Sequence, residues 1–150
     1  MIRPSAGELV AAARVARERA YAPYSGFRVG AALLADQGDV FTAANVENAS
    51  YGLAICAERS AVVAAVAAGY RSFVAIAVAG NGLDPVTPCG ACRQVLREFP
   101  NGVALEVICA GEAGDGLLTT TLGILLPESF GPESLGSPGG SGQAPRVDPR

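Results

Sequence analysis

Apolar residues near the start of the chain recur at helical spacing, with Leu9 and Ala13 on one face and arginines on the other. Ser5 precedes this stretch, and Glu8 follows Ser5 by three positions, which is the pattern of a capping box. The pattern predicts a first helix over about 5–20.

The rest of the chain alternates between short apolar strands and helices built from small residues. The predicted strands are 27–35, 39–47, 73–80, 104–110 and 117–122, and the predicted helices are 57–68 and 89–99, followed by a short helix or turn within 123–130. The first two strands flank the turn sequence DQGD and should form a hairpin. Strands that alternate with helices after an opening hairpin predict an α/β fold with three layers around one central sheet.

The length of 150 residues suits one domain, which we place at 1–135. From Gly131 onward the sequence is dense in glycine, proline and serine, and such a composition cannot build a core. We therefore predict a disordered tail over 136–150.

No run of about 20 apolar residues is present, and the N-terminal stretch lacks the apolar segment of a secretory signal. These absences predict a cytoplasmic protein without a membrane partner. Disulfides are rare in that compartment, so the four cysteines are expected to serve metal binding, catalysis or burial.

The charge pattern argues against a nucleic-acid partner. The net charge is −3, and the eleven basic residues, all arginine, form no concentrated basic face. The chain also lacks histidine and lysine, which excludes a Ser-His dyad and a Schiff-base lysine. A general base must then be a carboxylate, a thiolate or a group on a metal.

Three cysteines stand where helices are predicted to begin: Cys56, and the pair Cys89 and Cys92. A Cys-x-x-Cys pair alone suits a redox disulfide as well as a zinc site. A closed structural zinc site would need a fourth ligand, which Cys109 would have to supply, although its apolar strand suggests simple burial. Catalytic zinc takes three protein ligands and leaves one position for water, which the three cysteines satisfy.

Two charged residues follow Cys56 directly. Glu58 could lie beside an open metal position and carry protons between water and a leaving group. Zinc with three thiolates has a net charge of about −1, which Arg59 could offset by donating to a sulfur atom. Arg59 is therefore predicted to support the metal from outside its ligand set.

Zinc deaminases carry His or Cys, one residue, Glu, and later Pro-Cys-x-x-Cys. This chain has CAE at 56–58 and PCGAC at 88–92, together with YAPYSGFRVGAALL, NVENASYG, TPCGACRQV and ILLPESF in the same order as the family. Over about 7–130 the sequence resembles the cytidine deaminases of the small, homotetrameric, three-cysteine zinc type.

The resemblance implies a three-layer α/β/α sandwich around one central mixed sheet, and zinc-dependent hydrolysis of cytidine or deoxycytidine to uridine or deoxyuridine and ammonia. It further implies a set of site residues: Asn45 and Glu47 for the ribose hydroxyls, Phe27 beside the pyrimidine ring, the backbone at Ala57 for its amino edge, and Tyr51 and Phe130 at subunit contacts, with Phe130 completing a neighbouring active site.

Three other functions are compatible with the same cysteines. A blasticidin-type deaminase shares the metal site, but the NVEN segment at 45–48 favours an ordinary ribose. A deaminase that acts on a base in RNA or DNA would have to engage phosphates, which the acidic composition disfavours. A binding module held together by zinc would keep the metal and show no turnover.

Overall fold

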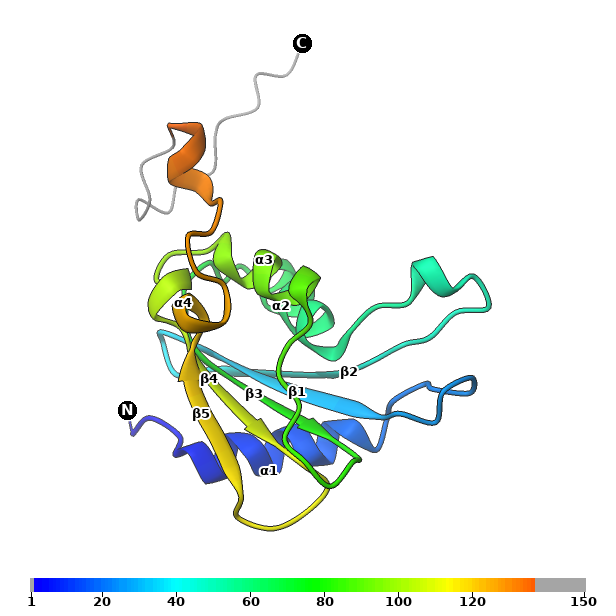
Figure 1. Cartoon of the computed structure of the whole chain (residues 1–150). Helices are drawn as coiled ribbons and strands as arrows, with labels where there is room; N and C mark the ends of the chain where they lie inside the picture. Colours follow the sequence, from blue (N-terminus) through cyan, green and yellow to red (C-terminus); the bar gives the residue numbers. More distant parts are fainter. Residues whose placement is uncertain (1, 137–150) are drawn as a thin grey trace.

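A single five-stranded sheet organises residues 2–136, the part of the chain that this computed structural model describes (Figure 1). The strands are β1 (Val29–Ala35), β2 (Val40–Ala44), β3 (Phe73–Gly80), β4 (Glu106–Ala110) and β5 (Leu117–Thr121), in the spatial order β2-β1-β3-β4-β5. β3 and β4 are parallel, and every other neighbouring pair is antiparallel. The sheet is therefore mixed, as predicted, and it opens with the predicted hairpin.

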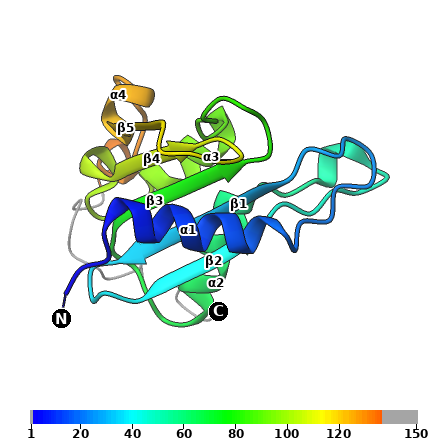
Figure 2. The same cartoon turned by 90° about the horizontal axis from the view of Figure 1, so that it is seen from below.

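Helices cover both faces of this sheet. They are α1 (Ala6–Arg17), α2 (Ala57–Ala67), α3 (Gly90–Arg97) and α4 (Leu122–Leu125). α1 lies on one face, whereas α2, α3 and α4 lie on the other (Figures 1 and 2). The predicted three-layer α/β/α sandwich is confirmed. Within residues 2–136, no helix has the length and apolarity needed to span a membrane.

The strands bury side chains on both faces because successive residues point to opposite sides of a sheet. Leu33 and Ile76 belong to the larger core cluster, which α2 and α3 complete. Leu34 and Ile108 belong to the second cluster, which Leu9 and its neighbours in α1 complete. Burial on both faces explains why the central strands are apolar throughout rather than alternating.

The ends of several elements differ from the prediction. The capping box is present, with the Glu8 amide donating to the Ser5 hydroxyl at 3.2 Å, but the helix ends at Arg17 rather than near 20. β2 stops at Ala44 rather than 47. A short 3₁₀ helix, Gly102–Ala104, replaces the expected start of β4, because Asn101 adopts a positive φ of 64°.

The segment after α4 is more ordered than its composition suggested. A 3₁₀ helix spans Pro132–Leu135, where a core-free stretch was expected. Arg97 of α3 is buried and reaches this segment, donating to the Ser129 hydroxyl at 2.8 Å and pairing with Glu133. Apart from Gly136, the predicted tail lies outside the described residues, and the domain bounds 1–135 stay a prediction.

Two loops project together from the body of the sandwich, on the same side (Figures 1 and 2). They are residues 21–27 and 46–55, which we call the arm. Isolated bridges pair Tyr21 with Val46 and Val46 with Ile55, so the two loops lie side by side. The arm contains a 3₁₀ turn, Tyr51–Leu53, and much exposed apolar surface.

Candidate metal centre and active site

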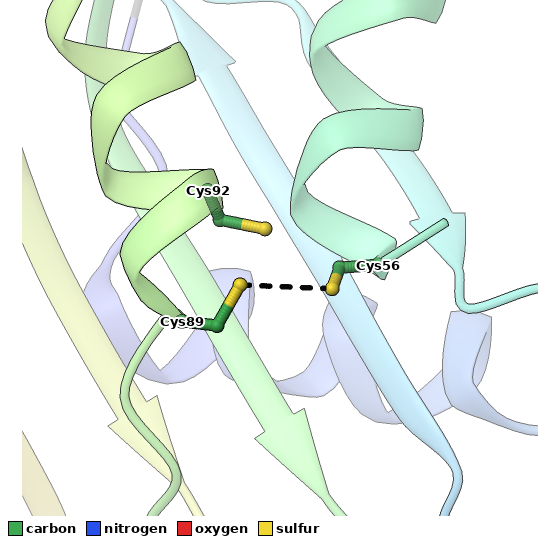
Figure 3. Close-up of side chains that lie close together, drawn as sticks. All are labelled: Cys56, Cys89 and Cys92. Atoms are coloured by element: carbon green, nitrogen blue, oxygen red, sulfur yellow. Dashed lines mark hydrogen bonds between the residues drawn. The ribbon is translucent and has the colours of Figure 1, made fainter. Parts of the chain in front are cut away.

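The beginnings of α2 and α3 bring three cysteines together (Figure 3). Cys56 is the N-cap of α2, Cys89 is the N-cap of α3, and Cys92 lies in the first turn of α3. All three sulfur atoms lie within 4.8 Å of one another, and those of Cys56 and Cys89 are 3.8 Å apart. Residues separated by more than thirty positions in sequence thus form one cluster because the two helices start at the same edge of the sheet.

The donor set and its spacing fit a zinc ion. Two sulfurs bound tetrahedrally to one zinc, at about 2.3 Å each, are about 3.8 Å apart. Cys109 lies in β4 and is not part of the cluster among the described residues, so a closed site with four cysteines is not formed. Burial instead raises the pKa of Cys109 to about 11, as expected for an inert core thiol.

The metal-free cluster already favours one thiolate. A hydrogen bond from the Cys92 thiol, with further donation from Arg59, lowers the pKa of Cys56 to about 5. The same contact with the Cys56 sulfur, together with burial, raises the pKa of Cys92. The site therefore concentrates negative charge on sulfur, which is the form that binds metal.

Arg59 approaches the cluster from the first turn of α2. Its Nη2 atom lies 3.6 Å from the Cys56 sulfur, and its role as a charge-compensating residue stays a prediction. Its buried Nε atom has no hydrogen-bond partner within the described part of the chain. A guanidinium held this close to sulfur offsets part of the charge that three thiolates would bring.

Glu58 lies in the first turn of α2, buried, and lines a cavity of about 210 Å³ that also reaches Cys56 and Cys89. Burial raises the pKa of Glu58, and the negative charge of Cys56 adds to this effect. A carboxyl group that holds its proton more readily than usual is suited to exchanging protons with a bound molecule. Ala57, which is fully buried, lines the same cavity.

Phe27 and Asn45 line the same cavity, so the structure brings both together with the metal cluster. The Asn45 side chain also bridges the backbone of the neighbouring loop. It donates to the Phe27 carbonyl at 2.9 Å and accepts from the Val29 amide at 2.8 Å. Each end of the amide keeps one further hydrogen-bonding position for a ligand.

Glu47 is not among the residues that line the cavity. Its carboxylate accepts hydrogen bonds from the amides of Tyr24 and Ser25 and from the Ser25 hydroxyl. The Ser25 hydroxyl contributes most to lowering the pKa of Glu47, so the group is a charged acceptor. Its predicted contact with a ribose stays a prediction.

Tyr51 and Phe130 lie apart from the cavity of their own chain. Their side chains are exposed, at 76% and 59% respectively, and the Tyr51 ring packs against Tyr24 in the arm. The backbone of Phe130 is held by Gln94 of α3, whose amide donates to the Phe130 carbonyl at 3.0 Å. Their predicted role at subunit contacts stays a prediction.

Several residues that shape the site were not anticipated. Val86 and Thr87 line the cavity just before Cys89, and Arg93 fastens this loop by donating to the Pro88 carbonyl at 2.7 Å and to the Thr87 hydroxyl at 3.1 Å. The only sequence feature that could have pointed to Val86, Thr87 and Arg93 was their position beside the cysteine motif. Without the loop geometry, however, nothing distinguished them from ordinary connecting residues.

Known proteins are similar to this chain in both sequence and fold. The family model of the cytidine and deoxycytidylate deaminase zinc-binding region matches residues 5–108. A cytidine deaminase of Sporosarcina psychrophila is 48% identical over 128 residues, covering 85% of this chain and 93% of that protein.

Solved structures agree. The crystal structure of a cytidine deaminase from Burkholderia pseudomallei has a TM-score of 0.80 and 53% identity, covering 85% of this chain and 100% of that one. The cytidine deaminase of Mycobacterium tuberculosis has a TM-score of 0.73 and 42% identity, covering 83% and 96%. The resemblance drawn from the sequence is confirmed, and the chain belongs to the cytidine and deoxycytidylate deaminase family.

Proposed function

We propose that this protein is a zinc-dependent enzyme that hydrolyses cytidine and 2′-deoxycytidine to uridine and 2′-deoxyuridine, with release of ammonia. One observation carries the proposal: Cys56 and Cys89 of the three-cysteine cluster and the buried Glu58 line one cavity together with Phe27 and Asn45. Metal ligands, a proton carrier and an aromatic ring thus surround one space. Such a reaction would place the enzyme in pyrimidine salvage.

The proposed metal ligands are Cys56, Cys89 and Cys92. Zinc held there would supply a Lewis acid that makes water a nucleophile near neutral pH. Arg59 would offset the charge of the thiolates through its contact with the Cys56 sulfur. No other metal-ligating group of three or more residues is found among residues 2–136.

Glu58 would carry the protons of the reaction. It would accept a proton from the attacking water and deliver protons to the pyrimidine ring and to the departing amine. A C–O bond forms, the C–N bond breaks, and water and the nucleoside become ammonia and the deaminated nucleoside. The raised pKa of Glu58 supports this role, because the carboxyl must both take up and release a proton.

The substrate would lie between the metal cluster and the loop that carries Phe27. The Phe27 ring would lie against the pyrimidine, and the backbone at Ala57 would meet its amino edge. Asn45 and Glu47 would hold the ribose hydroxyls, the first as donor and acceptor, the second as acceptor.

We further propose a homotetramer in the cytoplasm. The arm exposes several large apolar side chains, including Tyr51 and Leu53, and apolar side chains gathered on one projecting segment support a contact between proteins. Phe130, exposed beside α3, would complete the active site of a neighbouring copy. All four cysteines are unpaired, which suits a reducing compartment. Sedimentation would test the tetramer, and an active monomer would contradict a shared site.

The direct test is turnover of cytidine and 2′-deoxycytidine by purified protein with its zinc content confirmed, followed by loss of the cytosine absorbance. Ammonia released in equal amount identifies the reaction as deamination. Zinc-loaded protein that converts neither nucleoside would contradict the proposal.

A further inference from the structure

The Ser25 hydroxyl connects two residues of the proposed substrate site. It donates to Oε2 of Glu47 at 2.5 Å and accepts from the Phe27 amide at 2.9 Å. The Ser25 amide also donates to Oε1 of Glu47 at 3.1 Å. The Ser25 side chain thus connects Glu47, which is proposed to bind the sugar, with Phe27, which is proposed to lie against the pyrimidine.

The hydrogen bonds to Glu47 leave little freedom for its carboxylate. A carboxylate offers about four acceptor positions, two on each oxygen. The amides of Tyr24 and Ser25 occupy both positions on Oε1, at 2.9 and 3.1 Å, and the Ser25 hydroxyl occupies one on Oε2. One acceptor position remains, on Oε2, and the direction in which it points is set by the Ser25 hydroxyl.

The same loop determines where Phe27 lies. Its amide is held by Ser25 and its carbonyl by Asn45, so both polar groups of its backbone are fixed. The ring packs closely on Gly80, where an added Cβ atom would lie 3.2 Å from Cζ of Phe27. A shift of the Ser25 loop would therefore move the wall of the cavity.

We infer that Ser25 is a positioning residue, which directs the one free acceptor of Glu47 toward a sugar hydroxyl and holds Phe27 at the cavity. This inference rests on the proposed function, since it names how the same site would recognise a nucleoside. Ser25 itself is not among the residues that line the cavity. Its effect should therefore fall mainly on binding of ligands that carry ribose hydroxyls.

The test compares two ligands that differ only in those hydroxyls. Cytidine is measured as substrate, and 2′,3′-dideoxycytidine is measured as its competitor, so that an inhibition constant is obtained whether or not it reacts. We expect Ser25→Ala to raise KM for cytidine about tenfold with little change in kcat. The inhibition constant for 2′,3′-dideoxycytidine should rise no more than about threefold, because this ligand lacks the sugar hydroxyls and would be affected only through the position of Phe27.

Two further variants separate positioning from general damage. Ser25→Thr keeps the hydroxyl and should restore most of the affinity for cytidine. Ser72→Ala removes a hydroxyl that lies directly before β3 and outside the cavity lining, and it should leave both constants unchanged. Zinc content and melting temperature are measured for every variant.

The possible outcomes separate the proposed function from the role of Ser25. Wild-type protein that does not deaminate cytidine would overturn the proposed function. Active wild-type protein in which Ser25→Ala weakens both ligands equally, or neither, would overturn the role of Ser25 and leave the proposed function standing. Failure of Ser25→Thr to restore cytidine affinity would likewise count against the hydroxyl.

Discussion

The carbonyl oxygen of Ala13 in α1 lies so close to Gly30 in β1 that a Cβ atom on Gly30 would stand 1.8 Å from it. A second backbone atom, the amide nitrogen of Arg17, would lie at 2.6 Å. Rotation of a side chain cannot relieve such contacts, so α1 would have to move off the sheet. We expect Gly30→Ala to lower the free energy of unfolding by about 3 kcal/mol, measured by urea unfolding of the purified protein.

Gly7 in the same helix provides the matched control. A Cβ atom there would meet nothing within 4 Å, and the residue is exposed. Gly7→Ala should therefore stabilise the protein by about 0.5 kcal/mol, because alanine restricts the unfolded chain. If both substitutions changed stability in the same direction, close packing of α1 on β1 would not be the cause.

The capping box of α1 predicts a pH dependence. Hydrogen bonds from the Ser5 backbone and then its side chain hold the pKa of Glu8 below its ordinary value of 4.5. A carboxylate with a lowered folded-state pKa stabilises the fold above the unfolded-state pKa and loses that effect as the pH falls through the folded-state pKa. The stability difference between wild type and Glu8→Gln should thus be full at neutral pH and shrink below about pH 4.5. A difference that grows on acidification would contradict this sign.

Metal content tests the cysteine cluster. Cys92→Ala removes a proposed ligand and should weaken zinc binding by more than about 100-fold, since loss of a residue outside the ligand set alone costs about 10–100-fold. Cys109→Ala removes an equally buried cysteine that lies outside the cluster and should retain one zinc per chain. Zinc is measured by elemental analysis after dialysis against a chelator. Equal retention by both variants would exclude Cys92 as a ligand.

Glu58 can be tested without disturbing the metal. Glu58→Gln keeps the size of the side chain but cannot carry protons, and it should lower kcat by about 10²–10⁴-fold at unchanged zinc content. Glu98, exposed at the end of α3, supplies the control, because Glu98→Gln should retain full activity. Wild-type turnover by zinc-loaded Glu58→Gln would refute the proton-carrying role.

Arg59 is expected to affect activity through its contact with the Cys56 sulfur rather than through a contact with the substrate. Removal of its guanidinium leaves more of the charge of Cys56 uncompensated, so Arg59→Ala should reduce activity or zinc affinity about 10–100-fold. Arg71→Ala, beyond the far end of the same helix, is the comparison. If Arg59→Ala equalled Arg71→Ala in both activity and zinc affinity, the proposed role of Arg59 would be wrong.

The layers of the fold were predictable because their signals are local. β3 is an uninterrupted apolar strand, and the Ser5–Glu8 pair marks the start of α1 within three residues. The cysteine motif likewise lies in two short segments, so the cluster could be predicted before its geometry was known. The ends of elements were less predictable, since Asn101 begins a 3₁₀ turn through a positive φ that composition does not indicate.

The loop around Glu47 shows what sequence could not supply. Its carboxylate is held by groups 22 and 23 positions away, two of which are backbone amides that no residue pattern reveals. Arg97 is similar, because its contact with Glu133 depends on how the chain returns past α3 after the last strand. Such partners become visible only when the sheet order is known.

The three cysteines lie at the N-caps and in the first turn of two separate helices, and this has a consequence for how long the zinc-loaded enzyme keeps its metal. Helix ends are among the parts of a protein that open most readily. If zinc is bound as proposed, neither helix could unwind at its start without breaking a bond between zinc and a cysteine sulfur. The rate at which a chelator strips the metal would then report how often these two helix ends open, and hydrogen exchange at the same amides should follow that rate.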